Sequence, residues 1–315
     1  MNCYCCGKPL RTENPSRWHK ACVRRFFGTE LIPEFDIDEN TLESLVIEGT
    51  NKGYTVPGVQ KKLSLHLSSE ESTPRLTLVN HPTGFILKPQ VREYESLPEA
   101  EQLVMCMADA SGIATVPHAL VKCRDDLAYI TKRVDRLFAP DGVLMLAMED
   151  FCQLDLRLTQ DKYRGSYERC AKVIERYSSR KQLDLTELFL RIVFSFVVGN
   201  SDMHLKNFSL IETAAQSRAY VLAPAYDLLP VNVVLPEDTE QLALALNGKK
   251  TNIRKKDFLA FADASGISKV SAEKMIAKIV SMETQYLQMC DASLLPPHLK
   301  KRFAELITER CNILR

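Results

Sequence analysis

Two acidic residues and an asparagine in the C-terminal half have the types and spacing of a metal-assisted transfer site. Asp202 and Asn207 lie five residues apart in the segment GNSDMHLKNF (199–208), directly after an apolar helix-like run. A second carboxylate follows at Asp227, after a strand-like pair of segments. Asp202 is placed to act as a general base, while Asn207 and Asp227 offer hard oxygen ligands that suit Mg²⁺. This order of base, ligand and second ligand predicts a phosphoryl-transfer site.

The interval between Asp202 and Asn207 is the one that separates a catalytic-base aspartate from a magnesium-binding asparagine in protein kinases. His204 and Lys206 lie in the same loop. Lys206 is a candidate to contact the γ-phosphate, and His204 a candidate to hold the loop or the metal-bound phosphates. The alternatives are an ordinary turn for the Asp202–Asn207 pair, because both residue types are common in turns, and a structural role for His204.

A lysine and a glutamate upstream are candidates for the ion pair that directs an ammonium group at nucleotide phosphates. Lys88 ends the strand-like segment FILK (85–88), and Glu101 lies on the helix that is predicted to follow. In a kinase such a pair holds the ammonium group in place. The alternative is a solvated lysine at a strand end and a surface glutamate at a helix start.

The segment VPGVQKKL (56–63) is a candidate phosphate-covering loop, with Gly58, Val59 and Gln60 at its centre. Glycine permits close approach of the backbone, and backbone N–H groups can cradle anions. The segment is not a G-x-G-x-x-G motif, and the chain contains no Walker A sequence. A plain hairpin turn is the alternative interpretation.

The chain changes from strand-like to helical character near residues 132–137. Alternating apolar residues at 63–67 and 75–79 predict strands. A helix from about Pro98 to Gly112 interrupts this region. Later periodicity predicts a strand pair at 208–211 and 219–222, and helices at 149–160, 166–178, 186–198, 257–264, 271–290 and 297–311. We therefore predict an α+β, bilobal, protein-kinase-like fold.

The predicted organisation has four parts. Residues 1–30 form a Cys/His-rich unit, 31–53 a linker and helix, 54–132 a β-rich nucleotide-binding lobe, and 133–315 a helical catalytic lobe.

Composition excludes several functional classes. The 315 residues are 45% hydrophobic and 26% charged with a net charge of +1, so the kinase lobes are not expected to bind nucleic acid directly. No apolar run reaches the roughly 20 residues that span a bilayer, and the polar N-terminus is not a signal peptide. Most of the 10 cysteines lie in apolar or helix-like segments. They are expected to be reduced, which favours a cytoplasmic location.

The first 30 residues carry a candidate metal site. Cys3-x-x-Cys6 and His19-x-x-Cys22 fit a four-ligand structural zinc site, with Cys5 as an alternative ligand. The other interpretation is a metal-free, reduced segment whose aromatic residues Trp18, Phe26 and Phe27 pack on the kinase region.

These residues together resemble the HipA-like serine/threonine kinases of bacterial toxin–antitoxin modules. The resemblance covers roughly residues 54–310. It depends on the Asp202 loop and the segments PGVQKKLS (57–64), ILKP (86–89), TKRVDR (131–136), EDFCQ (149–153) and YDLLP (226–230). The chain is most similar to the short HipT type, because its kinase region begins near residue 54 without the N-terminal β-subdomain of full-length HipA.

The resemblance implies roles for several residues. Lys88, partnered by Glu101, would contact ATP phosphates, and the backbone near Lys132 and Val134 would hold adenine. Asp202 would be the base, with Asn207 and Asp227 as Mg²⁺ ligands.

The resemblance also implies regulation and partners. The family's glycine-rich loop carries serines that are autophosphorylated to silence the kinase. This chain reads YTVPG (54–58): Thr55 keeps a hydroxyl at the first of these serine positions, and Pro57 removes the second, so autoinhibition by this route would depend on Thr55. Expected partners are a DNA-binding antitoxin, a small protein similar to the N-terminal subdomain, and a protein substrate such as an aminoacyl-tRNA synthetase. The alternatives are a kinase-fold binding module without catalysis and a small-molecule phosphotransferase.

Overall fold

The computed structural model describes residues 1–11, 14–35, 62–68, 75–77, 83–123, 125–139 and 142–315. The chain forms two compact units. The first contains residues 1–102 and 116–143, and the second contains residues 103–115 and 144–315.

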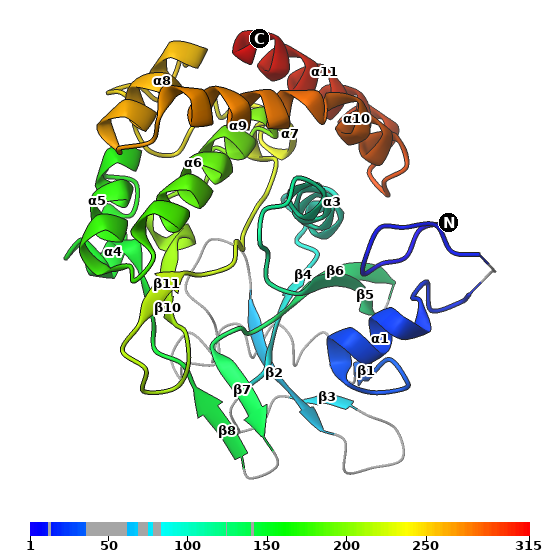
Figure 1. Ribbon diagram of the computed structural model, residues 1–315. Coiled ribbons are helices and arrows are strands. Elements are labelled where there is room, and N and C mark those ends of the chain that lie inside the picture. Colours follow the sequence, from blue (N-terminus) through cyan, green and yellow to red (C-terminus); the bar gives the residue numbers. More distant parts are fainter. Residues whose placement is uncertain (12–13, 36–61, 69–74, 78–82, 124, 140–141) are drawn as a thin grey trace. The chain divides into compact units, whose positions relative to one another are not determined.

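The first unit is built on a six-stranded sheet with strand order β1-β3-β2-β4-β6-β5 (Figure 1). Its strands are β1 (Glu34–Phe35), β2 (Leu63–Ser68), β3 (Arg75–Thr77), β4 (Phe85–Pro89), β5 (His118–Cys123) and β6 (Asp126–Lys132). β1 and β3 pair in parallel, and the other neighbours pair antiparallel. The predicted strand at 63–67 is present as part of β2, but its burial does not alternate: Leu63 to Leu65 are buried and the rest of the strand is partly exposed.

The N-terminal module, residues 1–11 and 14–28, packs on this sheet. Its helix α1 (Lys20–Phe27) ends at Gly28, whose φ of 77° suits glycine and whose N–H donates to the Arg24 carbonyl. Trp18, Phe26 and Phe27 form an aromatic cluster, and the rings of Phe26 and Phe27 lie 5.8 and 5.7 Å from that of Phe85 in β4.

Helix α3 (Leu97–Ala110) begins one residue before the predicted start at Pro98 and ends two residues before Gly112. Residues 97–102 of α3 belong to the first unit and residues 103–110 to the second. The helix ends before Gly112, which has a φ of 77°.

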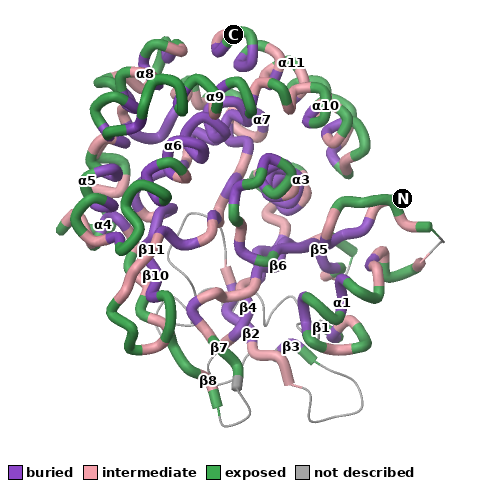
Figure 2. Tube along the Cα trace, viewed as in Figure 1, coloured by how far each residue is buried: buried purple, intermediate pink, exposed green. Residues whose placement is uncertain are grey.

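The second unit is mainly helical, and helix α6 (Lys181–Val197) lies in its core. α6 is buried along most of its length and contacts α5 (Tyr167–Tyr177), α9 (Lys269–Ser281) and α11 (Pro297–Leu314) (Figure 2). A three-stranded sheet, order β11-β10-β9, flanks the loop that follows α6. Its strands are β9 (Met148–Asp150), β10 (Ser209–Glu212) and β11 (Tyr220–Leu222).

The remaining elements are short or terminal. β7 (Arg136–Ala139) pairs with β8 (Gly142–Met145). The others are α4 (Phe151–Leu154), η1 (Thr159–Asp161), η2 (Leu205–Asn207), α7 (Val231–Val234), α8 (Lys255–Ala264) and α10 (Glu283–Asp291). Among the described residues, no helix combines the length and apolar content needed to cross a bilayer.

Two helix predictions were wrong in extent. The helix expected at 149–160 is only α4 followed by η1, because Leu156 adopts a φ of 53°, which ends an α-helix. The helix expected at 271–290 is split into α9 and α10 at Met282. There the N–H donates to the carbonyl of Ile279, three residues back, so the chain tightens into a turn.

Candidate active site

The loop after α6 is shaped by a glycine that no other residue could replace without strain. Gly199 has a φ of 68°, and a Cβ atom there would lie 3.0 Å from the side chain of Leu306. The next residue, Asn200, is fully buried, and its side-chain oxygen accepts a hydrogen bond from the N–H of Asp202 at 3.2 Å. The glycine turn and the buried asparagine therefore fix where Asp202 leaves the helix.

Asp202 and Asn207 lie together, as their spacing predicted. The Asn207 side-chain nitrogen donates to the Asp202 backbone carbonyl at 2.8 Å. This bond directs the amide nitrogen at the loop itself, so the amide oxygen is the atom that can bind a cation. The Asp202 carboxylate has a side-chain exposure of 41%, so a substrate can reach it.

The Asp202 carboxylate is oriented by Tyr163, a residue that sequence reasoning missed. The Tyr163 hydroxyl donates to Oδ1 of Asp202, and His204 Nε2 lies 3.9 Å from the same oxygen. The Tyr163 ring meets the His204 ring edge-on at 4.9 Å. Burial and the bond to Asp202 raise the pKa of Tyr163, so its hydroxyl remains a donor.

Asp227 adopts a backbone conformation that is uncommon for a residue other than glycine, with a φ of 55°. The preceding residue anchors it, because the Tyr226 hydroxyl bonds Ser209 Oγ at 2.6 Å and the Lys206 carbonyl at 3.1 Å. Burial raises the pKa of Tyr226, which keeps this hydroxyl protonated. Strained aspartates of this kind are concentrated at functional sites.

His204 is buried and uncharged at neutral pH. Burial lowers its pKa, against the opposing effect of the Asp202 and Asp227 charges, while Lys162 lowers it further. Among the described residues its Nδ1 atom has no hydrogen-bond partner. A neutral imidazole beside two carboxylates fits a positioning role better than the role of a fixed positive charge.

Lys206 pairs with Asp150, a second residue to which the sequence assigned no role. Its Nζ atom lies 2.6 Å from Asp150 Oδ2, while Asp150 Oδ1 accepts the N–H of Gln153 at the start of α4. Asp150 could have been recognised as a helix N-cap, but no sequence signal connects it with Lys206.

In the first unit, the structure brings Lys88 and Glu101 into a buried ion pair. The ammonium nitrogen lies 2.5 Å from Glu101 Oε1, and the two side chains are only 4% and 1% exposed. The ammonium group also lies 5.2 Å from the Tyr129 ring centroid, on the neighbouring strand β6. A buried ammonium group needs such partners, and removing one of them leaves an uncompensated charge. The alternative of a solvated lysine is therefore wrong.

The predicted adenine-binding segment (131–136) begins in the last residues of β6 and continues past its end. The Lys132 N–H donates to the Pro117 carbonyl at 2.9 Å, and the Arg133 N–H donates to the Gly84 carbonyl at 2.8 Å. Burial lowers the pKa of the Lys132 side chain. The predicted Gly58, Val59 and Gln60 loop and Thr55 lie outside the described residues.

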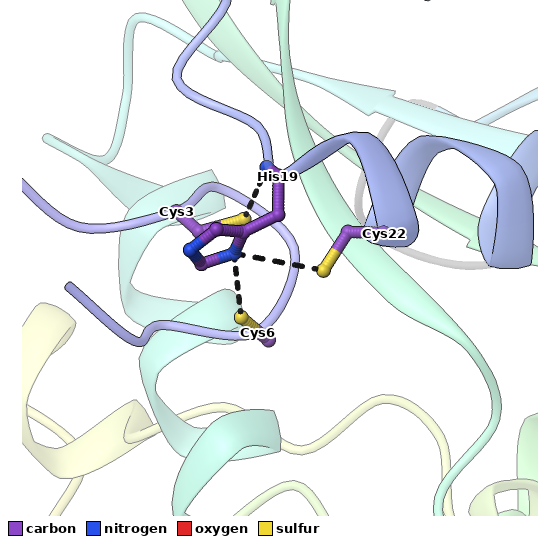
Figure 3. Close-up of side chains that lie close together, drawn as sticks. All are labelled: Cys3, Cys6, His19 and Cys22. Atoms are coloured by element: carbon purple, nitrogen blue, oxygen red, sulfur yellow. Dashed lines mark hydrogen bonds between the residues drawn. The ribbon is translucent and has the colours of Figure 1, made fainter. Parts of the chain in front are cut away.

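The four N-terminal zinc-ligand candidates converge on one point (Figure 3). Ligand atoms of Cys3, Cys6, His19 and Cys22 all lie within 4.8 Å of one another. His19 Nδ1 lies 3.5 Å from Cys6 Sγ and 3.8 Å from Cys22 Sγ. Among the described residues, Cys5 is not part of this cluster.

The fold and these side chains define a class of protein. The first unit holds a buried pair between Lys88 on its sheet and Glu101 on α3, and the second unit holds the Asp202–Asn207 loop and Asp227. Groups of these types occur in protein kinases. A family model described as the HipA-like C-terminal domain matches residues 54–286, and the chain belongs to this family.

Curated relatives are similar over much of this chain. The protein named "Putative kinase Y4mE" from Sinorhizobium fredii is 29% identical over 72% of this chain and 54% of its own length. A protein named "Putative kinase" from Haemophilus influenzae is 28% identical over 79% and 78%. "Putative kinase Y4dM" from S. fredii is 30% identical over 68% and 54%. The chain thus spans about half the length of the two S. fredii relatives.

Two solved structures share the fold. HipA of Shewanella oneidensis MR-1, solved with HipB and operator DNA, has a TM-score of 0.68 at 20% identity, covering 86% of this chain and 70% of that one. The proinflammatory kinase CtkA of Helicobacter pylori has a TM-score of 0.56 at 15% identity, covering 82% and 90%. These matches confirm the predicted α+β, kinase-like fold.

Proposed function

We propose that this chain transfers the γ-phosphoryl group of ATP to a serine or threonine hydroxyl of a protein. The observation that carries the proposal is the Asp202 loop, where a half-exposed carboxylate is oriented by Tyr163 and its backbone is fixed by Asn207. A phosphoryl transition state with little covalent character requires positioning and charge neutralisation more than a strong nucleophile. Family membership supports the same reaction class.

The chain's residues fit the groups that such a reaction needs. The Asn207 amide oxygen and the Asp227 carboxylate are hard ligands suited to Mg²⁺, which would neutralise phosphate charge. Lys88, held by Glu101, would contact the phosphates. Val134 would supply the backbone contact to adenine, because the Lys132 N–H is already bonded to Pro117.

Asp202 would take the proton of the acceptor hydroxyl. The hydroxyl oxygen would then bond to the γ-phosphorus as the bond from that phosphorus to the ADP oxygen breaks. Tyr163 acts through Asp202 and is a positioning residue: it occupies Oδ1, so Oδ2 is the oxygen for the acceptor.

The partners of this reaction follow from the family resemblance. We propose a protein acceptor, with aminoacyl-tRNA synthetases as the class to test first. We also propose a DNA-binding antitoxin as partner, because the similar HipA of S. oneidensis was solved with HipB and operator DNA.

A second metal is proposed for the N-terminal module, where Cys3, Cys6, His19 and Cys22 would hold a structural zinc ion. Zn–N and Zn–S bonds of about 2.0–2.1 and 2.3 Å, at a tetrahedral angle, place nitrogen and sulfur about 3.6 Å apart. The separations of His19 Nδ1 from Cys6 Sγ and Cys22 Sγ, 3.5 and 3.8 Å, fit this arrangement. His19 Nε2 lies 3.2 Å from the Pro9 carbonyl, a contact that orients the ring.

The reaction is tested by incubating purified protein with labelled ATP, Mg²⁺ and bacterial lysate. Label should appear in few protein bands, and Asp202→Asn should reduce it by about 10²–10⁴-fold, the usual effect of losing a general base. The exposed Asp263→Asn serves as the matched control and should label like the parent. Equal labelling by Asp202→Asn would rule out this base, and labelling of small molecules without protein would indicate the other acceptor class.

A further inference from the structure

The N-terminal module makes two separate contacts with the elements that carry the Lys88–Glu101 pair. The first is aromatic: Phe26 and Phe27 of α1 pack against Phe85, which lies three residues before Lys88 on β4. The second is polar: the Cys5 carbonyl accepts a hydrogen bond from Gln102 Nε2 at 2.9 Å, and Gln102 follows Glu101 on α3. Each partner of the ion pair therefore lies within three residues of a contact with this module.

The polar contact is buried and has a second partner. Gln102 is 5% exposed, and its Oε1 atom lies 2.8 Å from His118 Nδ1 on β5. The neighbouring Tyr4 carbonyl accepts the N–H of Leu120, also on β5, at 2.9 Å. Gln102 thus connects the backbone of the module, the edge strand of the sheet and the helix that carries Glu101. Buried hydrogen bonds of this kind specify one arrangement, because breaking one leaves polar groups unsatisfied.

The backbone that makes these contacts lies between the metal-ligand candidates. Tyr4 and Cys5 are the two residues between Cys3 and Cys6, and α1 begins directly after His19 (Figure 3). The aromatic cluster packs one side of the module on the sheet, and a metal ion would add order by joining the Cys3–Cys6 segment to the start of α1. Without the ion, the carbonyls of Tyr4 and Cys5 and the start of α1 lose their common anchor.

We propose that the zinc-loaded N-terminal module positions the Lys88–Glu101 pair. Gln102 is the positioning residue, because its hydrogen bond to the Cys5 carbonyl links the module to α3. The proposal rests on the proposed nucleotide-binding role of Lys88. It predicts that zinc acts far from the chemistry: loss of the ion loosens β4 and the start of α3 and weakens nucleotide binding, while the helices α9 to α11 remain unaffected.

Metal content and hydrogen–deuterium exchange test this without any catalytic readout. The full-length protein should contain about one zinc ion per chain, and Cys6→Ser should lose it. Cys170→Ser is the control, because it changes a buried thiol in α5 of the second unit and leaves every residue of the module in place. After chelation, or in Cys6→Ser, amides of β4 and the start of α3 should exchange about 10-fold faster, with no change in α9 to α11.

Gln102→Met tests the link separately from the metal. This variant should retain zinc, yet show the faster exchange in α3 and bind a fluorescent ATP analogue about 10-fold more weakly, since misplacing a positioned group has effects of this size or more. Ser111→Ala is the control and should bind normally. It removes a buried hydroxyl just past the other end of the same helix, which donates to the Met107 carbonyl at 2.6 Å and also bonds the Tyr286 hydroxyl at 2.5 Å.

Each outcome decides a different point. A parent protein without zinc, or a Cys6→Ser variant that retains it, overturns the metal assignment. Zinc loss without faster exchange in β4 and α3 overturns the positioning role. A parent that binds no ATP analogue contradicts the proposed function instead, and the exchange data still decide whether the module orders β4 and α3.

Discussion

The side chain of Tyr163 connects the chemistry of the loop with residues that the sequence could not relate to it. A general base works efficiently only when a further group holds it in a productive orientation. Here the Tyr163 hydroxyl and the His204 ring both approach Oδ1 of Asp202. Because Tyr163 is 39% exposed and contributes one hydroxyl, its loss should affect orientation far more than folding.

We expect Tyr163→Phe to lower kcat by about 10-fold while leaving KM for ATP unchanged, because a misoriented base slows transfer without altering nucleotide binding. In an Asp202→Asn background the same substitution should cause no further loss, since the two residues act as a unit. Steady-state kinetics of the two single variants and the double variant measure this. Tyr177→Phe in α5 is the control. Additive losses in the double variant would show that Tyr163 acts elsewhere.

The proposed base, Asp202, and the proposed metal ligand, Asp227, can be distinguished by their effects on nucleotide binding. ATP with Mg²⁺ should raise the melting temperature of the parent and of Asp202→Asn, because a base is not needed for binding. Ligand at 100 times its Kd contributes about 2.7 kcal/mol of stability. Asp227→Asn should show little of this shift. ATP without Mg²⁺ is the control in thermal melts, and an undiminished shift in Asp227→Asn would exclude Asp227 as a ligand.

Among the helices, α8 shows how a buried carboxylate sets a helix start. Asp257 is fully buried and accepts bonds from the Arg254 N–H at 2.9 Å, Asn247 Nδ2 at 2.9 Å and Lys249 Nζ at 2.8 Å. Burial alone would raise the pKa of Asp257, but these bonds together lower it. The ionised form is therefore the one that the folded state stabilises.

Asp257→Ala should reduce the free energy of unfolding at pH 7 by about 2–3 kcal/mol, because several buried donors lose their acceptor. The stability that ionised Asp257 gives the parent is fully present above the unfolded-state pKa of about 3.9. It is lost as pH falls through the lower folded-state pKa. Urea unfolding at pH 7 and at successively lower pH measures this. Asp263→Ala, exposed on the same helix, should stay within about 0.5 kcal/mol of the parent. A difference that did not shrink on acidification would contradict the assigned charge state.

Considered as one chain, the protein places its candidate groups in two compact units. The first holds the metal-ligand cluster and the Lys88–Glu101 pair, and the second holds Asp202, Asn207 and Asp227. The N-terminal module belongs to the same unit as Lys88, so its proposed effect on order is expected within that unit.

Local spacing was sufficient for much of the fold and for the core of the candidate site. The alternating segment at 63–67 predicted β2, and the apolar period before Gly199 predicted α6, although its start was placed five residues too late. Asp202 and Asn207 meet because a short loop brings residues at this interval together. Within Cys3-x-x-Cys6 and within His19-x-x-Cys22, the short spacing keeps the two residues close, while the meeting of the two pairs depends on how the N-terminal module folds.

Tertiary packing alone decided which side chains contact Asp202, Lys206 and the Cys5 carbonyl. Tyr163 lies 39 residues from Asp202, Asp150 lies 56 residues from Lys206, and Gln102 lies 97 residues from Cys5. Periodicity and motif spacing report which face of an element is buried and which residues share a loop. They did not indicate these three contacts, because such contacts depend on how buried surfaces fit and on every buried donor finding an acceptor.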